Sequence, residues 1–501
     1  MKRSLFTMIT KSIFFISILT ILLMSIAVAD TYYIAPTGND SNNGSLASPW
    51  LTVKHARKNS GGGDTVFVRG GTYSNGEIWL QKGNQGGGIA NQFWTLKAYP
   101  GEVPVFANTR FIVDADYIRI QGLHLTGSSY IQSVSWSGMH ERIEFLDNYI
   151  SGSPTVPLYF MTNKGLVQGN KIISTSAIHA IYVMHGDGNI VRNNYIAGMS
   201  KYGIHIYDEN KYNHTARITN LLVENNTVIG SQSRSGIIIS AGESTGSGIE
   251  IDGVVVRNNI TINNAEDGIT IRYYGSVRNV DIFNNVMYGN HAVGLRIIAH
   301  NVDNVAIRNN IFASNGTHIN ISSHLNNLVD SHNLYYQPSS IGLGATDDYA
   351  VYELPLFVNV AEYDFHLKED SPAIDAGVYV GIPYNGDAPD LGAFEYGQSS
   401  TIESKIEQPD QFNVQQNYPN PFNPSTEICY SIPSAIDVEL SIFDIMGRHI
   451  ITLVREKQSE GQKTVTWNGK DENNMKVSSG IYLYRLRAGE FTVTKKMLLV
   501  Q

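Results

Sequence analysis

One asparagine returns at nearly regular intervals through the middle of this 501-residue chain. It is the second residue of a pair that is usually Asn-Asn, and successive copies lie 22, 24, 32, 33, 26, 25 and 23 residues apart. A period in the low twenties with insertions indicates a solenoid of stacked coils. The eight positions are Asn148, Asn170, Asn194, Asn226, Asn259, Asn285, Asn310 and Asn333.

Short apolar runs flank each asparagine, such as residues 221–223 before Asn226 and residues 228–229 after it. No window carries the i, i+3, i+4, i+7 spacing of an amphipathic helix over ten residues, so each coil is predicted to consist of short strands. Strands of successive coils then pair in parallel. A stacked asparagine can form hydrogen bonds with its neighbours and with the backbone of the turn. We therefore assign a structural role to this column.

The repeat resembles the right-handed parallel β-helix proteins, which include polysaccharide lyases, pectin-acting hydrolases and uronate epimerases. Residues 32–73 are similar to the start of many secreted members, and residues 365–377 and 389–396 are similar to their closing segment. The resemblance implies an all-β, right-handed parallel β-helix over residues 30–396. Its expected parts are an N-terminal cap (about 30–110), regular coils (about 111–335) and a closing segment (about 336–396).

The C-terminal region has a different composition. Alternating strands are predicted at residues 438–443, 461–467, 481–487 and 491–499, separated by turn residues. Such short strands indicate a small β-sandwich over residues 413–501, after a linker at 397–412.

This region resembles the C-terminal sorting domains of the bacterial type IX secretion system. The resemblance rests on Asn-Tyr-Pro-Asn-Pro-Phe-Asn-Pro at 417–424 and on residues 444–448, 479–482 and 495–500. It implies that outer-membrane secretion machinery is a partner, and that export ends in release or attachment to the cell surface.

The N-terminus has the pattern of a signal peptide over residues 1–29. Basic residues precede an apolar stretch at 13–24, and Ala27-Val28-Ala29 offers a cleavage site. Removal would leave 33 basic and 45 acidic residues, a net charge of −12. Such a balance argues against nucleic acid as a partner, and the single cysteine, Cys429, excludes an intrachain disulfide. We expect a secreted or cell-surface monomer that passes through the periplasm.

One strand per coil has a common register, in which two aliphatic positions face inward and the residues between them face outward. These strands start at Ala180, Gly203, Gly236, Gly268, Gly294 and His318. The first outward column reads Tyr182, His205, Ile238, Thr270, Arg296, Asn320, and the second reads Met184, Tyr207, Ser240, Arg272, Ile298, Ser322.

An open face with aromatic residues, a histidine and arginines suits an acidic polysaccharide. Arginine holds a uronate carboxylate by two hydrogen bonds, and it stabilises the negative charge that develops when the neighbouring C–H bond breaks. His205, Tyr207 and Arg272 are the candidate catalytic residues, with the histidine or the tyrosine as base or acid. Tyr182 and Arg296 are candidate substrate-binding residues. Stacked rings also stabilise coils by packing alone, so a structural role stays open for each.

Acidic residues at the ends of neighbouring strands form a second candidate group. Asp208, Glu209 and Glu243 follow strands, and Glu266-Asp267 precede another. Paired carboxylates could hydrolyse a glycosidic bond, or several oxygens could bind Ca²⁺. Ca²⁺ is the one cofactor that the sequence leaves open. As an alternative to both roles, these acidic residues could simply lie in solvated turns.

The sequence therefore predicts a secreted β-helix protein that acts on an acidic polysaccharide, with β-elimination as the leading reaction. The motif series of polygalacturonases is absent, and the lysine base of some Ca²⁺-dependent lyases has no obvious counterpart. Uronate epimerisation, glycoside hydrolysis and non-catalytic surface binding or adhesion remain as alternatives.

Overall fold

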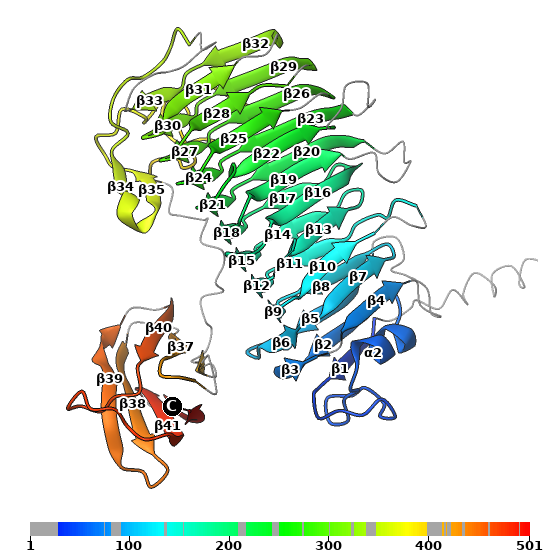
Figure 1. The fold of residues 1–501 in the computed structure, drawn as a ribbon, viewed down its shortest axis with the longest axis vertical. Helices are drawn as coiled ribbons and strands as arrows, with labels where there is room; N and C mark the ends of the chain where they lie inside the picture. Colours follow the sequence, from blue (N-terminus) through cyan, green and yellow to red (C-terminus); the bar gives the residue numbers. More distant parts are fainter. Residues whose placement is uncertain are drawn as a thin grey trace, which may run out of the picture. The chain divides into compact units, whose positions relative to one another are not determined.

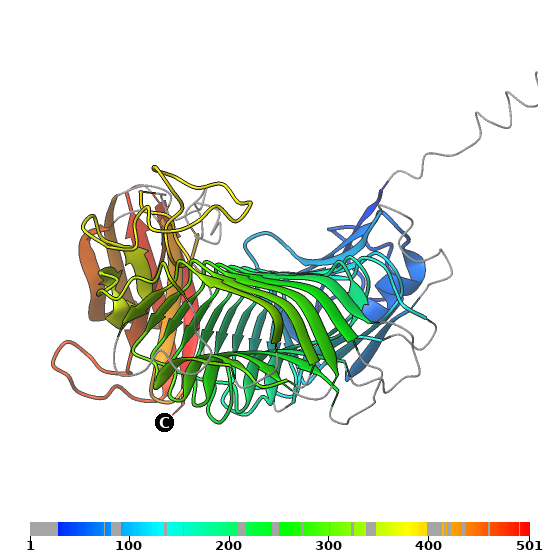
Figure 2. The same cartoon turned by 90° about the horizontal axis from the view of Figure 1, so that it is seen from above.

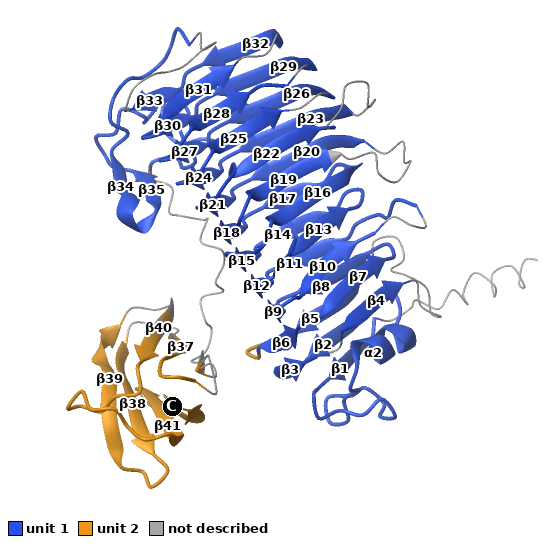
Figure 3. Cartoon of the chain, viewed as in Figure 1, with its two compact units in different colours: residues 1–99, 103–396 blue, residues 100–102, 397–501 orange. Residues whose placement is uncertain are grey.

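The computed structural model contains two compact units (Figure 3). Residues 1–99 and 103–396 belong to the first, and residues 100–102 and 397–501 to the second. The described residues are 29–74, 76–81, 92–134, 138–153, 155–208, 217–242, 250–272, 275–299, 301–321, 325–336, 347–397, 413–414, 417, 422–432, 436–458, 461–489 and 491–500.

The first unit is a parallel β-helix with three faces, as predicted (Figures 1 and 2). Each coil gives one strand to each of three parallel sheets. Sheet 1 contains β1 (Thr31–Ile34), β2 (Thr65–Val68), β5 (Trp94–Ala98), β8 (Ile118–Gln121), β11 (Glu144–Leu146), β14 (Leu166–Gln168), β17 (Ile190–Arg192), β20 (Ile218–Glu224), β23 (Glu250–Arg257), β26 (Ser276–Phe283), β29 (Asn301–Arg308) and β32 (Leu325–Ser331).

Sheet 2 carries the strands whose register was predicted. It contains β4 (Glu77–Gln81), β7 (Arg110–Asp114), β10 (Tyr130–Ser133), β13 (Leu158–Met161), β16 (His179–Asp187), β19 (Tyr202–Asp208), β22 (Ile237–Ala241), β25 (Asp267–Arg272), β28 (Val293–Ile297) and β31 (Thr317–Ile321). The long strand β16 also pairs with β20, which joins sheets 1 and 2.

Sheet 3 consists of three- and four-residue strands that follow the asparagine turns. It contains β3 (Gly71–Tyr73), β6 (Pro104–Ala107), β9 (His124–Thr126), β12 (Tyr149–Ser151), β15 (Lys171–Ile173), β18 (Tyr195–Ala197), β21 (Thr227–Ile229), β24 (Ile260–Ile262), β27 (Val286–Tyr288), β30 (Ile311–Ala313) and β33 (Leu334–Tyr336).

The coils begin earlier than the repeat suggested. Residues 30–110, expected to form a cap, already supply strands β1 to β6 to the three sheets. Their spacing lacks the asparagine marker, which is why the sequence repeat did not reveal them. The short helix α2 (Val53–Asn59) packs against β4 and β1, and its Val53 and Ala56 belong to the core.

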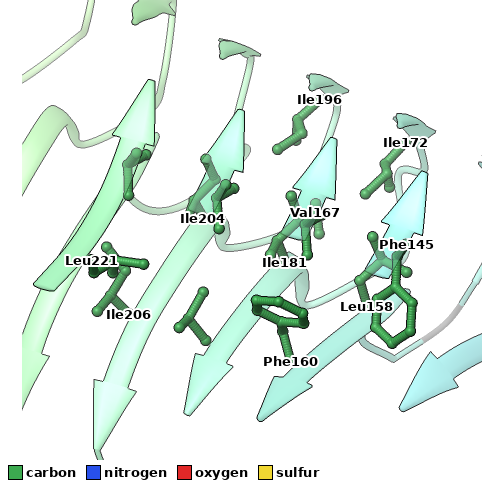
Figure 4. Packing of buried hydrophobic residues seen from close by; sticks show 14 of the residues in the cluster. Phe145, Leu158, Phe160, Val167, Ile172, Ile181, Ile196, Ile204, Ile206 and Leu221 are labelled. Atoms are coloured by element: carbon green, nitrogen blue, oxygen red, sulfur yellow. The ribbon is translucent and has the colours of Figure 1, made fainter. Parts of the chain in front are cut away.

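Alternate side chains of all three sheets fill the interior (Figure 4). Phe145, Val167 and Leu221 come from sheet 1, and Phe160 and Ile204 come from sheet 2. All five are buried, with at most 1% of their surface exposed. One row of apolar side chains per sheet therefore closes the core, as period-two alternation requires.

The predicted asparagine column is a buried hydrogen-bond ladder. The Nδ2 of Asn148 donates to the Oδ1 of Asn170 at 3.0 Å, and Asn170 donates in the same way to Asn194 at 3.0 Å. The same bond links every later member down to Asn333. Asp347 then accepts from the Nδ2 of Asn333 at 3.0 Å and ends the ladder.

The first residue of each pair turns the chain from sheet 1 into sheet 3. Asn193, Asn225 and Asn258 have φ values of 56°, 56° and 53°, in the left-handed region. Asparagine tolerates this conformation better than most residues. The Asn-Asn pair thus combines a turn former with a ladder member.

The closing segment covers the outer face of sheet 3 in the last coils. Its β34 (Phe357–Asn359), 3₁₀ turn (Val360–Glu362) and β35 (Asp364–Leu367) form a small antiparallel element. Phe365 and Leu391 pack against outward side chains of β24, β27 and β30. Asn309 also accepts from the backbone N–H of Val378 at 2.9 Å, so the turn residues anchor the segment.

The second unit is a small antiparallel β structure with its own core. Its strands, four of which overlap the predicted ones, surround buried Trp467, Tyr430 and Tyr484. They are β36 (Asn413–Val414), β37 (Thr426–Ile432), β38 (Ile436–Asp444), β39 (His449–Gln458), β40 (Gly461–Trp467), β41 (Gly480–Ala488) and β42 (Phe491–Leu499). In the described part of the chain, no helix has the length and apolar character needed to span a membrane.

Replacing Asn259 by alanine should destabilise the β-helix by about 3–5 kcal/mol, because buried polar groups left unpaired cost about 1–3 kcal/mol each. The Oδ1 of Asn259 accepts from both the backbone N–H and the Nδ2 of Asn226. Urea denaturation measures the change. Asn326→Ala, at an exposed strand position of sheet 1, is the control and should change stability by less than about 0.5 kcal/mol. Equal effects would contradict a structural ladder.

Stability should fall between about pH 5 and pH 8 because of Glu395. Burial raises the pKa of this closing-segment carboxyl from 4.5 to about 7. The protonated form is therefore favoured by folding, so its contribution is complete below pH 4.5 and is lost as pH rises through 7. Glu395→Gln should remove about 2 kcal/mol of this pH dependence in urea denaturation. The exposed Glu369→Gln is the control, and an unchanged profile in Glu395→Gln would contradict the assignment.

Candidate active site

The predicted first outward column of sheet 2 is present in the structure. Tyr182 pairs with His205, which pairs with Ile238, and the column continues through Thr270 to Arg296. In the second column, Tyr207 pairs with Ser240 and Ser240 with Arg272. The coils therefore make neighbours of residues that lie up to 33 positions apart in the chain, such as His205 and Ile238.

The aromatic members of these columns form a stack. The rings of Tyr182 and His205 are 4.8 Å apart and nearly parallel, and those of His205 and Tyr207 are 5.1 Å apart. Tyr159 of the preceding coil continues the stack, with its ring 5.9 Å from that of Tyr182. Sequence reasoning missed Tyr159, because it began the aligned column one coil later.

The face is more enclosed than expected. Tyr182, His205 and Tyr207 are only 7%, 8% and 8% exposed. The short outward residues Ser240 and Thr270 are fully buried. The expectation of an open face was therefore wrong at these positions. Tyr182 and Tyr207 also belong to an apolar cluster with Val156 and Met161.

His205 lies in an environment that favours its neutral form. Its Nδ1 is 3.3 Å from the Nε2 of His179, so one of these nitrogens donates and the other accepts. Burial, together with His179, Lys201 and Arg272, holds the pKa of His205 well below its usual value of 6.5. Burial also lowers the pKa of His179 to about 4. Neutral imidazoles at working pH can accept a proton.

His179 and Tyr202 were not singled out from the sequence. Both lie at the starts of strands, beside the stack, with their rings 5.3 Å apart. His179 occupies the residue before the aligned register begins, where alternation gives no prediction. The sequence signal that could have pointed to His179 was the presence of a histidine in each of two neighbouring coils, His179 and His205.

Arg272 is the most accessible of the three catalytic candidates, with 20% of its side chain exposed. Its Nη1 is 3.9 Å from the Oε1 of Glu266. The assignment of Arg272 to holding a carboxylate stays a prediction.

Arg296 forms an ion pair within the face. Its Nε and Nη2 donate to the two carboxylate oxygens of Asp267 at 2.7 and 2.8 Å. Asp267 is fully buried and also accepts from the Thr270 hydroxyl at 2.8 Å. Asp267 therefore occupies one edge of the guanidinium, and the substrate-binding role of Arg296 stays a prediction.

The rest of the acidic group lies largely outside the described residues. Glu209 and Glu243 fall outside them, and only the backbone of Asp208, at the end of β19, is described. Within the described ranges, no three His, Cys, Asp or Glu side chains gather in a way that could hold a metal ion. A role for these carboxylates in Ca²⁺ binding or hydrolysis stays a prediction.

Glycines near the starts of β22 and β25 allow a second asparagine ladder to approach these strands. A Cβ on Gly236 would lie 2.8 Å from the Nδ2 of Asn264, and one on Gly268 would lie 2.9 Å from that of Asn290. Asn264 donates to Asn290 at 2.8 Å, and the bond repeats from Asn290 to Asn315. This buried ladder, unrecognised in the sequence, ties sheet 3 to the strands that carry the site.

Comparison with known proteins identifies the first unit. Residues 32–310 match the model of the Pel9A-like right-handed β-helix region. The chain belongs to this family. The match includes every coil that carries the aromatic stack and both arginines, and it agrees with the predicted handedness of the solenoid. In the second unit, residues 424–490 match the FlgD Ig-like domain.

Individual relatives are distant members of the same architecture. The chain is 26% identical to the uncharacterized protein YwoF of Bacillus subtilis over 444 residues, which covers 69% of this chain and 92% of the relative. It is 24% identical to pectate lyase PEL9 of Emericella nidulans over 336 residues, covering 58% and 80%. The crystal structure of pectate lyase Pel9A shares the fold, with a TM-score of 0.51, 18% identity, and coverage of 74% and 98%.

A double-mutant cycle on Asp267 and Arg296 should show strong coupling. Each single alanine variant leaves a partly or fully buried charge unpaired, whereas the double variant removes both. We expect a coupling energy above about 1.5 kcal/mol in urea denaturation. Coupling near zero would show that the ion pair adds no net stability to the face. Arg119 and Glu144, paired at 2.7 Å on the outer face of sheet 1, provide a matched pair for comparison.

Proposed function

We propose that this protein cleaves a uronate-containing polysaccharide by β-elimination on the outer face of sheet 2. The observation that carries the proposal is the family match over residues 32–310, which includes all of the strands bearing the candidate residues. A relative named pectate lyase supports an acidic glycan as the substrate. The chemistry of the face agrees, because an arginine and a neutral histidine lie within three coils.

In this proposal Arg272 binds the carboxylate of one sugar unit. Its positive charge stabilises the negative charge that develops when the proton at C5 is removed. Neutral His205 accepts that proton, the bond from C4 to the glycosidic oxygen breaks, and a C4–C5 double bond forms. Tyr207 then donates a proton to the departing oxygen. Arg272, the most exposed of the three side chains, makes the first contact with the polysaccharide.

We also propose that the protein acts outside the cytoplasm. The predicted signal peptide over residues 1–29 supports export. The C-terminal unit, which matches an Ig-like domain, is proposed to serve as the sorting domain that the sequence resembles. The acidic polysaccharide substrate and the secretion machinery are then the two proposed partners.

The purified protein should generate ultraviolet absorbance from the conjugated C4–C5 double bond when it is mixed with one of a panel of acidic polysaccharides. Arg272→Ala should lower kcat/KM by about 100-fold or more, as expected when charge stabilisation in the transition state is lost. Arg272→Lys should restore part of the activity, since it keeps the charge without the planar two-bonded contact. Repeating the assay with a chelator decides whether Ca²⁺ is required.

Arg119→Ala is the control, because Arg119 also lies in an ion pair but on the outer face of sheet 1. It should retain full activity. New reducing ends without ultraviolet absorbance would contradict β-elimination and favour hydrolysis. Normal turnover in Arg272→Ala, His205→Ala and Tyr207→Phe would show that the reaction takes place elsewhere.

A further inference from the structure

A second column of chemistry-bearing side chains lies on sheet 3, away from the candidate active site. From β9 onward, the first residue of each sheet 3 strand occupies an outward position, and parallel pairing aligns these residues along the solenoid axis. Tyr149 of β12 pairs with Lys171 of β15, and Lys171 pairs with Tyr195 of β18. We refer to Tyr149, Lys171 and Tyr195 as the tyrosine–lysine column.

The same position changes character along the solenoid. After Tyr195 the column continues through Thr227 to Ile260, Val286 and Ile311. Those three aliphatic residues are buried beneath the closing segment. Tyr149 and Tyr195, by contrast, are 37% and 38% exposed. The column is therefore aliphatic beneath the closing segment, whereas Tyr149, Lys171 and Tyr195 are exposed.

The lysine of the column is placed between two rings. Its Nζ is 5.9 Å from the ring centroid of Tyr149 and 5.7 Å from that of Tyr195. These cation–π contacts hold the ammonium of Lys171 between the two tyrosine rings. Among the residues that the structure describes, no carboxylate lies within ion-pair distance of Lys171, although the chain has a net charge of −9.

The two tyrosines are two coils apart, which corresponds to about 10 Å along the axis. The faces of the Tyr149 ring are directed at neighbouring coils, since the ring of His124 in β9 lies 4.6 Å away and the Nζ of Lys171 lies over it. A ligand on the outer surface therefore meets the edges and hydroxyl groups of the tyrosines, and a tyrosine hydroxyl can donate to and accept from sugar hydroxyls. The ammonium between them offers a partner for an anionic group on the intervening sugar.

We propose that the tyrosine–lysine column is an accessory binding site for an acidic polysaccharide chain that runs along the solenoid axis. Its occupant is a stretch of uronate units, hydrogen-bonded to the hydroxyls of Tyr149 and Tyr195 and paired with Lys171 through a carboxylate. The choice of an acidic glycan rests on the proposed function. This site would hold the polymer on sheet 3, while cleavage takes place on sheet 2.

The test is affinity electrophoresis of the full-length protein in gels that contain polygalacturonate or, separately, a neutral glucan. The wild-type protein should be retarded by polygalacturonate only. The double variant Tyr149→Ala/Tyr195→Ala should bind at least tenfold more weakly, and Lys171→Glu should weaken binding without removing either ring. Tyr379→Ala is the control, because Tyr379 is 65% exposed but lies in the closing segment away from this column. Thermal unfolding confirms that each variant is folded.

Cleavage of short oligosaccharides separates this site from the active site. Both column variants should cleave them at the wild-type rate, since short chains need only sheet 2. Undiminished polymer binding in the variants, or equal retardation by the neutral glucan, would overturn the accessory site while leaving the proposed reaction intact. The wild-type protein could also bind the polymer without any lyase activity. If the column variants then lose this binding, the result supports the accessory site and refutes the proposed reaction.

Discussion

The buried ladder of asparagine amides is the constraint on which the solenoid depends. Each amide accepts from the coil before it and donates to the coil after it, in a region with almost no solvent. A polar group in such a place costs free energy unless it is paired, so one missing member leaves donors unpaired in two coils. The ladder also needs ends. The backbone N–H of Leu123 donates to Asn148 at one end, and the carboxylate of Asp347 accepts from Asn333 at the other.

The ladder sets the register of everything outside the core. Because each asparagine is held against its neighbour, the strands that follow and precede it are aligned in every coil. The outward residues of sheets 2 and 3 therefore stand in straight columns. The coils between Asn194 and Asn259 are about ten residues longer than the shortest ones, and the columns stay aligned across them. This tolerance lets the same solenoid carry different side chains on its outer faces.

Burial and charge pairing divide the residues of sheet 2 between structure and chemistry. Asp267 and Arg296 form an ion pair inside the face, and the Nη1 of Arg272 lies 3.9 Å from the Oε1 of Glu266. The neutral forms of the histidines are favoured because their surroundings are apolar and positively charged. The proposed reaction uses a neutral histidine and a cationic arginine on the same face to remove a proton next to a carboxylate.

The sequence by itself determined the solenoid, the structural role of the asparagine pairs and the register of the outward columns. These follow from local rules: a repeat length, a left-handed turn residue and period-two alternation. Only the tertiary structure decided which outward residues are enclosed, that Asp267 pairs with Arg296, and that a second asparagine ladder exists. It also decided that the closing segment covers Ile260 but leaves Tyr149 exposed. These outcomes depend on contacts between residues far apart in the chain, such as Asn258 with Ala393, 135 positions away, and no local pattern encodes which distant segment will pack on a given face.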